Sequence, residues 1–512
     1  MASQITPLSL TAPGFYGLNT QDSPTDMDVR FSLTATNCVI DRSGRVSSRK
    51  GWERQHDAIP ALAGEDVDAM GELISTNGDS TVIAAGNNKL FKLVGTTLSE
   101  LTYGGGGVAP TISSDNWQMV SLNNALTMFQ LSHDPLIYDT TLSTTQYRRL
   151  SEHPSYSGTA PLANCAISAY GRLWAARTAS DKTTLKWSDT GTHQKWTGGS
   201  SGSLDLTTVW PNGADEIVAL ASHNNNIVIF GRRQTLIYSG PTTPSTMALN
   251  DSITGIGCVA RDSVQFTGED VIFLSDSGLR SLSRTIQEKS APLRTISRNV
   301  NDDIIQYIGT TTDVDVKSVY SSSDAFYLLS FRQGGVTYCF DMRSPLQDGS
   351  ARATFWSNIS PKSFLYARGQ KLLIGKPGYI GRYYGSLDDG STFRMTYATS
   401  WIDFGRPMAL TILKKIMMVI IGAQNQSVVF KWGFDYIPFS GSDSSTLGGT
   451  AVSEYNISEY GIGEYNANPT VSVVSMPAGG SGKVVQVGFE AQSSSYPISI
   501  QKIDVYTKEG RL

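Results

Sequence analysis

The sequence predicts an all-β protein, and three observations lead to this fold class. The chain of 512 residues contains 49 glycines and only 17% charged residues, which is typical of proteins rich in turns and short strands. No long stretch shows the 3.6-residue period of an amphipathic helix, and only Ser297–Ile305 suggests a short one. A pattern of three short strands recurs along most of the chain.

The clearest copy of this pattern runs from Glu216 to Gly240 and reads EIVALASHNNNIVIFGRRQTLIYSG. Its apolar runs are rich in β-branched and aromatic residues, while the breaks are rich in Asn and Gly, which tolerate positive φ. The runs are too short for helices. They predict strands over Ile217–Ala221, Ile227–Phe230 and Gln234–Tyr238.

Seven copies of the pattern follow one another, beginning at Leu73, Gln118, Ile167, Glu216, Val264, Val319 and Ser363. Their spacing of about 45 to 55 residues is the length of one four-stranded propeller blade. The sequence therefore predicts a β-propeller of about seven blades, or of six if the first or last copy belongs to a flanking part. A β-sandwich with regular hairpins gives a similar pattern and is the alternative.

Both ends of the chain depart from this rhythm, which predicts three parts: residues 1–60, a propeller over 61–392, and residues 393–512. In the third part, Leu413–Ile421 and Val428–Phe434 predict a long hairpin. The last part of the sequence predicts two further strands, over Lys483–Phe489 and Ile498–Tyr506.

Two groups of residues in the flanking parts are candidates for contacts between subunits. The first part holds a basic cluster, and the third part holds tyrosines at five-residue intervals. Arginine and tyrosine are favoured in protein interfaces. The alternatives are a solvated or ion-paired surface for the arginines and surface packing for the tyrosines. The candidates are Arg42, Arg45, Arg49, Arg54, Tyr455, Tyr460 and Tyr465.

The sequence predicts no catalytic, cofactor-binding or metal site, and we expect no enzyme activity. No two of the five histidines have metal-ligand spacing, so surface or loop positions are expected for His56, His133, His153, His193 and His223. There is no Gly-x-Ser-x-Gly elbow, and no carboxylate pair stands out. The four cysteines are far apart and are expected to be buried free thiols.

Charge and hydropathy argue against a protein that grips nucleic acid, a signal peptide and a membrane-spanning segment. The net charge of −4 argues against a protein that grips nucleic-acid phosphates, although not against one that nucleic acid merely passes. The first residues, MASQITPLSL, show no signal-peptide pattern. The longest strongly apolar run, Ile416–Ile421, is too short for a membrane-spanning segment.

Both ends of the chain contain patterns that resemble one known family. The opening contains Gly-Leu-Asn-Thr at 17–20, Asn37-Cys38-Val39, Gly44-Arg45 and Arg49-Lys50-Gly51-Trp52. The final part contains Trp432-Gly433-Phe434-Asp435, the Glu-Tyr-Asn repeats, and the segments 482–488 and 501–511. These patterns are similar to those of the tail nozzle, or tail tubular protein B, family of short-tailed bacteriophages. The two matched ends cover roughly a third of the chain, and the repeats between them match in kind only.

The resemblance implies an architecture and a function. The first and last segments would form a β-sandwich-like platform, and six subunits would build a nozzle ring below the adaptor ring of the tail. The partners implied are further copies of the chain, the adaptor, tail fibres or spikes, and genomic DNA that passes without sequence-specific binding. The location implied is the short tail of the virion, assembled in the cytoplasm of the bacterial host.

A carbohydrate-binding or carbohydrate-hydrolysing propeller, acting as a receptor-binding tail component, is the alternative function. Trp187-Ser188-Asp189 resembles the Asp-box turn of sialidase propellers. An Asp box has one residue between its Ser and its Asp, whereas Ser188 and Asp189 are adjacent. We therefore expect these residues to be turn residues of a hairpin.

Overall fold

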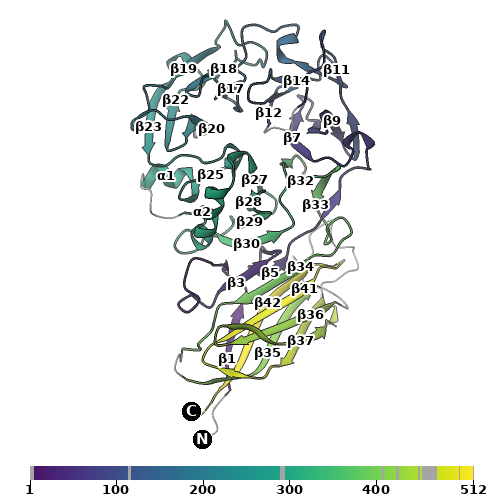
Figure 1. Cartoon of the computed structure of the whole chain (residues 1–512), viewed down its shortest axis with the longest axis vertical. Helices are drawn as coiled ribbons and strands as arrows, with labels where there is room; N and C mark the ends of the chain where they lie inside the picture. Colours follow the sequence, from purple (N-terminus) through teal and green to yellow (C-terminus); the bar gives the residue numbers. More distant parts are fainter. Residues whose placement is uncertain are drawn as a thin grey trace.

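The structure is a computed structural model that describes residues 5–112, 117–288, 295–405, 409–422, 426–447, 450–451, 470–494 and 496–510. In Figure 1 a ring of small β-sheets lies above an elongated platform of long strands. Within the described part, the α-helices are α1 (Leu282–Glu288) and α2 (Asn301–Thr310), so the expected all-β class is confirmed. Neither of these helices is long and apolar enough to cross a membrane.

Seven sheets follow one another around the ring, and we number them 1 to 7 in chain order. Sheet 1 consists of β7 (Val67–Ile74), β8 (Ser80–Gly86), β9 (Lys89–Val94) and β10 (Thr97–Glu100). Sheet 2 consists of β11 (Thr102–Tyr103), β12 (Gln118–Leu122), β13 (Ala125–Phe129), β14 (Leu136–Asp139) and β15 (Gln146–Arg149). Sheet 3 consists of β16 (Cys165–Ala169), β17 (Arg172–Ala176), β18 (Thr184–Trp187) and β19 (Gly202–Asp205).

Sheets 4 to 7 complete the ring. Sheet 4 consists of β20 (Ile217–His223), β21 (Asn226–Gly231), β22 (Gln234–Ser239) and β23 (Ala248–Thr254), and sheet 5 of β24 (Gln265–Phe266), β25 (Val271–Ser275) and β26 (Gly278–Ser281). Sheet 6 consists of β27 (Val316–Ser321), β28 (Phe326–Phe331), β29 (Val336–Asp341) and β30 (Arg352–Ser357). Sheet 7 consists of β31 (Phe364–Ala367), β32 (Lys371–Lys376), β33 (Tyr379–Tyr383) and β6 (Trp52–Arg54).

This ring is a β-propeller, as the repeats predict. The strand of each sheet that lies nearest the axis, which we call its inner strand, contacts the inner strands of the neighbouring sheets. Such contacts run from β7 through β12 and β16 to β20. Six of the seven ring sheets contribute four strands or more to the ring, while sheet 5 has three and is followed directly by α1. The structure therefore has six complete blades, and the fifth sequence copy, which begins at Val264, forms the three-stranded sheet.

Asparagine turns shape the blades as the repeat chemistry predicts. The β8–β9 and β20–β21 hairpins turn at Asn87-Asn88 and Asn224-Asn225, and all four residues have positive φ between 45° and 58°. Two consecutive positive φ values match the right-handed twist of a two-residue hairpin. The strand expected over Ile217–Ala221 is β20, and those expected over Ile227–Phe230 and Gln234–Tyr238 are β21 and β22.

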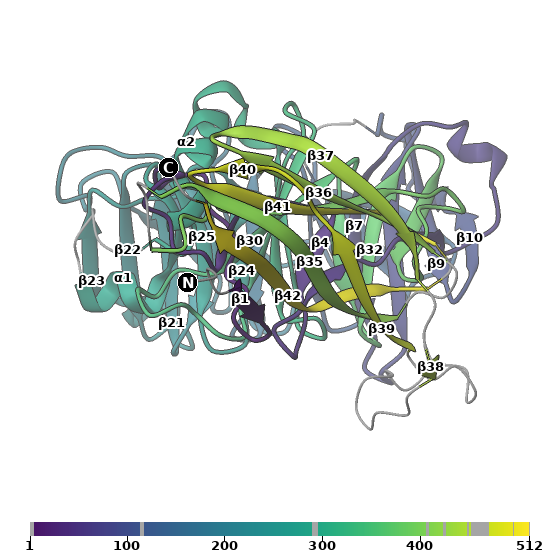
Figure 2. The same ribbon diagram turned by 90° about the horizontal axis from the view of Figure 1, so that it is seen from below.

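The platform consists of two sheets that draw strands from both ends of the chain. One sheet contains β1 (Ile5–Thr11), β4 (Cys38–Ile40), β5 (Val46–Ser48), β35 (Thr411–Gly422), β38 (Thr450–Ala451), β39 (Thr470–Pro477), β40 (Ser481–Gly482) and β42 (Ile498–Glu509). The other contains β2 (Gly17–Leu18), β3 (Phe31–Thr36), β34 (Arg394–Thr399), β36 (Ser427–Phe434), β37 (Ile437–Thr446) and β41 (Val485–Gln492). Figure 2 shows these long strands crossing beneath the ring.

The second platform sheet is continuous with the propeller. Strands β27 to β30 of sheet 6 lead through β2 and β3 into β34, β41, β36 and β37, which makes one ten-stranded sheet. A single apolar core accompanies it, since Leu329 and Phe340 of the propeller belong to the same buried cluster as Ile416 and Phe430 of the platform. The propeller and the platform are therefore joined by hydrogen-bonded strands as well as by side-chain packing.

Three local expectations can be compared with the observed elements. The hairpin expected from Leu413–Ile421 and Val428–Phe434 is wrong, because β35 pairs with β39 and β42 while β36 pairs with β37 and β41. The chain crosses between the two platform sheets at this point. The short helix is confirmed but is displaced to Asn301–Thr310, after a 3₁₀ turn. All four cysteines are buried free thiols, as expected.

Candidate functional site

The N-terminal segment meets the propeller and the platform at a seam centred on Arg49, which is 1% exposed. The guanidinium donates two hydrogen bonds of 2.8 Å to the Asp388 carboxylate and one of 3.0 Å from Nε to Oδ1 of Asn37. Its Nη1 also donates to the Lys50 carbonyl, and its Cζ atom lies 3.8 Å from the centre of the Phe393 ring. All three guanidinium nitrogens are therefore hydrogen-bonded inside the subunit.

The other residues of the N-terminal pattern build the same seam. Asn37, at φ 54°, donates from Nδ2 to the Ser357 hydroxyl and the Arg394 carbonyl, both at 2.8 Å. Gly51 has no room for a side chain, because a Cβ there would lie 1.8 Å from the Leu387 carbonyl oxygen. Trp52 begins β6, which pairs with β33 and closes ring sheet 7. The pattern thus encodes the junction between the chain ends and the ring.

The interface candidates have different surroundings in the structure. Arg42 is exposed, with Nη2 donating to the Ser323 carbonyl, and Arg45 is partly buried. Arg54 is exposed but is paired with Asp389 and lies over the Tyr379 ring. Arg49 is buried in the seam and presents no surface to a neighbour. The tyrosines Tyr455, Tyr460 and Tyr465 lie outside the described residues.

Charged side chains cross the propeller axis near the start of the inner strands. Arg261, 4% exposed and just before sheet 5, donates from Nη2 to the Trp117 carbonyl at 2.8 Å and from Nη1 to the Asn164 carbonyl. Trp117 directly precedes β12 of sheet 2, which lies three sheets away from sheet 5 around the ring. Arg177 of sheet 3 likewise lies 3.6 Å from Asp313, just before sheet 6. These contacts close the axis of the propeller at this end.

A carboxylate balances the buried cations in this network. Asp262 contacts the Arg261 Nε at 2.7 Å and the Lys317 Nζ at 2.5 Å. Burial alone would raise the pKa of Asp262, but the charges of Arg261 and Lys317 outweigh burial and hold that pKa well below its usual range. Burial in turn lowers the pKa of Lys317. Paired side chains therefore occupy the centre of the propeller at this end.

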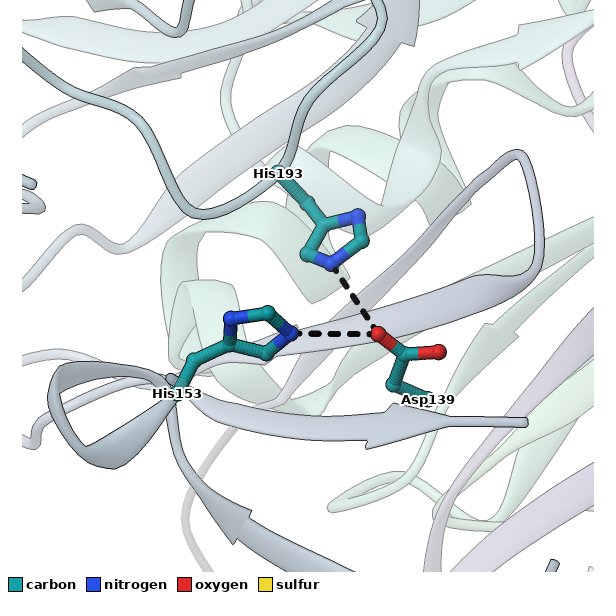
Figure 3. A group of neighbouring side chains, drawn as sticks. All are labelled: Asp139, His153 and His193. Atoms are coloured by element: carbon teal, nitrogen blue, oxygen red, sulfur yellow. Dashed lines mark hydrogen bonds and ion pairs between the residues drawn. The ribbon is translucent and has the colours of Figure 1, made fainter. Parts of the chain in front are cut away.

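A second buried polar cluster lies between ring sheets 2 and 3. Asp139 is the last residue of β14, His153 follows a 3₁₀ turn after β15, and His193 lies in the loop between β18 and β19. Backbone hydrogen bonds hold the two histidine segments together, from the Ser157 amide to the Gln194 carbonyl and from the amide of residue 196 back to Ser157. In Figure 3 both imidazoles direct a nitrogen at the same carboxylate oxygen.

Distances within the cluster differ between the two histidines. The Nε2 atom of His153 lies 3.2 Å from Oδ2 of Asp139, whereas the Nε2 atom of His193 lies 3.6 Å from the same oxygen. The imidazole centres are 5.5 Å apart and nearly perpendicular, at 83°. Burial opposes ionisation of Asp139, but the contacts with His153, His193 and Thr141 outweigh it and hold the pKa of Asp139 well below its usual range.

The histidines are expected at surface or loop positions, and His56, His133, His153 and His193 do lie outside the strands, while His223 ends β20. Four of the five are buried, namely His56, His153, His193 and His223, whereas His133 is exposed. Asp139, His153 and His193 are 14 and 40 residues apart in sequence, so no short motif contains them. The folded ring brings them together because neighbouring blades lie side by side, and only a correct blade alignment could have identified the cluster from sequence.

The hairpins at the other end of the inner strands surround an open hollow of about 420 Å³. Its lining includes the aromatic rings of Tyr170 and Phe266 and the polar groups of His223, Asn224 and Glu269. Phe266 is 58% exposed, which is unusual for a large apolar side chain. The adjacent Asp-box-like residues are turn residues, as expected, with Asp189 accepting hydrogen bonds from the Thr190 and Ser200 amides.

Comparisons with known proteins concern the propeller fold. No protein-family model and no curated protein matches the chain. Similar solved structures include the Pan2 WD40 domain of Neurospora crassa (9% identity, 67% of this chain and 98% of that chain, TM-score 0.39) and YCF48 from Cyanidioschyzon merolae (10% identity, 65% and 99%, TM-score 0.38). Hsv2 of Kluyveromyces lactis is another (9% identity, 57% and 97%, TM-score 0.29). At these identities and TM-scores the likenesses add nothing about function.

Proposed function

We propose that this protein is a structural subunit of a short-tailed bacteriophage tail. Six copies, the number that the family resemblance implies, would form a nozzle ring below the adaptor. The observation that carries the proposal is the ten-stranded sheet that joins ring sheet 6 to the platform. A propeller fixed to a platform by continuous strands is a stiff building block, because bending it would break a row of backbone hydrogen bonds. Stiffness is what a tube under internal DNA pressure requires.

The closed propeller axis restricts where DNA passes in such a ring. Arg261 and Arg177 reach across the centre of each propeller, so the channel would lie between subunits around the symmetry axis of the ring. The chain carries a net charge of −4. A weakly acidic wall would let the DNA phosphates pass without holding them, which suits both retention by a closed tail and rapid ejection. The role is mechanical, and no catalysis is proposed.

The partners of the proposed ring are further copies of this chain, the adaptor, tail fibres or spikes, and the passing genomic DNA. Among the interface candidates in the described residues, Arg42 and Arg54 are exposed and Arg45 is partly exposed. We propose that they act with Tyr455, Tyr460 and Tyr465, since desolvated arginine and tyrosine contribute most to interface energy. The proposed location is the tail of the virion, after assembly in the bacterial cytoplasm.

Electron microscopy of assembled particles tests this function. Antibodies against the chain should label the distal tail of intact virions. Replacing Tyr455, Tyr460 and Tyr465 together with alanine should leave a folded monomer but give tails that end at the adaptor and leak DNA. The matched control replaces Leu131, Leu142 and Leu249, three exposed propeller residues, and should give normal tails. Absence of the chain from tails, or full infectivity of the tyrosine variant, would contradict the ring function or this interface, respectively.

A second candidate function, binding of a carbohydrate receptor, is favoured by the hollow beside Phe266. Stacking of a sugar ring on Tyr170 or Phe266, with hydrogen bonds to Asn224 and Glu269, is chemistry that this lining allows. Glycan-array binding by purified protein would support it if Phe266→Ala abolished the signal. Virion labelling and glycan binding are independent readouts, so the two candidates can be separated.

A further inference from the structure

We propose that Asp139, His153 and His193 form a binding site for a divalent transition-metal ion of the zinc class. The three side chains offer one carboxylate oxygen and two imidazole nitrogens that lie within 4.8 Å of one another. All three residues are buried, at 7%, 8% and 8% exposure. Imidazole and carboxylate are established zinc ligands, and three protein ligands with a solvent molecule in the fourth position form a common zinc coordination.

The distances from the Asp139 oxygen to the two imidazole nitrogens match the separation between ligands of a tetrahedral ion. Zinc bonds to nitrogen and oxygen are about 2.0–2.2 Å long, so the edge of the tetrahedron is about 3.4 Å. The Nε2 atoms of His153 and His193 lie 3.2 Å and 3.6 Å from Oδ2 of Asp139, on either side of that value. Small movements of these side chains would therefore be enough to coordinate an ion.

Asp139 is prepared to act as a ligand. Its Oδ1 atom accepts hydrogen bonds from the Thr141 amide at 2.8 Å and the Thr141 hydroxyl at 2.6 Å, which fixes the orientation of the carboxylate. The other oxygen, Oδ2, faces the two imidazoles. Hydrogen bonds to the remote oxygen of a ligating carboxylate are a usual feature of metal sites, because they hold the ligand in position.

His193 is the residue whose surroundings point most directly to a ligand. Within the described residues, neither of its ring nitrogens makes a hydrogen bond, although both are buried, and Nε2 has only the 3.6 Å contact with Oδ2 of Asp139. A buried polar group without a partner is rare, since it loses its hydrogen bonds to water and gains nothing in return. A metal ion bound at Nε2 would supply the missing interaction for that nitrogen.

His153 determines what happens to the ring protons when the ion binds. Its Nδ1 atom accepts a 3.1 Å hydrogen bond from the Ser155 amide, so in the neutral ring without metal the proton is on Nε2. An ion at Nε2 needs the lone pair there, so the proton must be on Nδ1 instead. The Ser155 hydrogen bond then breaks, and the tautomer of His153 reports directly on metal binding.

The ion would join neighbouring blades. Asp139 and His153 belong to the segments of ring sheet 2, and His193 belongs to the outer loop of sheet 3. The apolar core between these two sheets already includes Phe129 and Trp196, whose rings contact edge to face. A bound ion would add a polar link at the margin of this core and would stabilise the ring against separation of the two blades.

Titration of metal-free protein with zinc chloride tests the site. We expect one ion per full-length chain, and at least tenfold weaker binding for His193→Ala and for Asp139→Asn. The matched control is His133→Ala, because His133 is an exposed histidine close to Asp139 in sequence and should not change the affinity. Circular dichroism establishes that each variant is folded before it is titrated.

Nitrogen NMR of the histidine rings in the wild-type protein gives a second test that needs no variant. Without metal, His153 should be protonated on Nε2; with one equivalent of zinc, the proton should be on Nδ1. No stoichiometric zinc binding by the wild-type chain, equal binding by His193→Ala, or an unchanged His153 tautomer on saturation would overturn the proposal.

Discussion

The seam around Arg49 and the cluster around Asp139 are both buried polar groups that join separate parts of the fold, yet their hydrogen bonding differs. At the seam, every guanidinium nitrogen of Arg49 has a partner, and the Asp388 carboxylate accepts both terminal hydrogen bonds. In the cluster, both ring nitrogens of His193 lack a hydrogen-bond partner among the described residues. The hydrogen bonding of Arg49 is therefore satisfied within the chain, whereas that of His193 is not, since its closest polar contact is at 3.6 Å from Asp139.

This difference in hydrogen bonding distinguishes a structural cluster from a ligand-binding cluster without any comparison of homologous sequences. A buried charge that is fully paired contributes to the specificity of the fold, and removing one partner leaves the other uncompensated. A buried group without a partner contributes little in the free protein, and its removal should be tolerated. Substitution at the Arg49 seam should therefore lower the free energy of unfolding strongly, whereas substitution of His193 in metal-free protein should change it little.

The largest effect is expected at Asp388. Replacing it with asparagine leaves the Arg49 guanidinium buried without its counter-charge, and breaking a buried pair in this way costs about 3–5 kcal/mol. We expect the free energy of unfolding of Asp388→Asn to fall by that amount, as measured by urea denaturation of the full chain.

The neighbouring residue provides a matched control for this prediction. Asp389 pairs with Arg54, whose side chain is 46% exposed, and such pairs contribute about 0–1 kcal/mol. Asp389→Asn should therefore be close to wild type. Equal destabilisation by the two variants would show that the seam does not depend on the completeness of its hydrogen bonds.

The sequence predicts the blades for physical reasons, but it does not predict the seam, where Arg49 is expected as a candidate for contacts between subunits. Strand chemistry and asparagine turns are local, so the first three strands of sheet 4 are located to within two residues. The residues of the N-terminal pattern, such as Gly51 and Asn37, are constrained by backbone geometry that a short motif can record. The role of Arg49 was not apparent, because its partner Asp388 is 339 residues away.

Features that depend on pairing between distant segments could not be predicted in the same way. The strands β35 and β36 look like a hairpin in sequence, but β35 pairs with β42 and β36 with β41, because each platform sheet takes strands from both ends of the chain. The Asp139 cluster depends on the alignment of two blades, and the histidines show no spacing that would reveal it. Local chemistry predicts elements, whereas the site depends on their arrangement.

A smaller effect is expected from the charge of Asp139. The pKa of this carboxyl is held below its usual range in the folded chain, so the folded state binds fewer protons than the unfolded state in acid. The stability that ionised Asp139 contributes is therefore present above about pH 4 and is lost as the pH falls through the folded-state pKa. Asp139→Asn lacks this titration.

Comparison of the two proteins across the acid range measures this contribution. With a chelator present to remove metal, we compare the unfolding free energies of the wild type and Asp139→Asn. The contribution of ionised Asp139 to their difference should be constant from pH 5 to 7 and should shrink below about pH 4. Asp389→Asn, assayed in parallel, controls for the loss of one carboxylate. A difference that grows in acid would show that Asp139 is held in its neutral form, in conflict with its position between two imidazoles.

The smallest effect is expected at His193 in metal-free protein, and it tests the comparison most sharply. His193→Leu replaces a buried ring without hydrogen-bonded nitrogens by an apolar side chain, a change that we expect to alter the unfolding free energy by less than about 1 kcal/mol in chelator. With saturating zinc, the wild type should become more stable and the variant should not, because only a chain that binds the ion gains from it. If His193→Leu were as damaging in chelator as Asp388→Asn, the cluster would be a complete structural unit like the seam, and unpartnered nitrogens would not mark a ligand site in this fold.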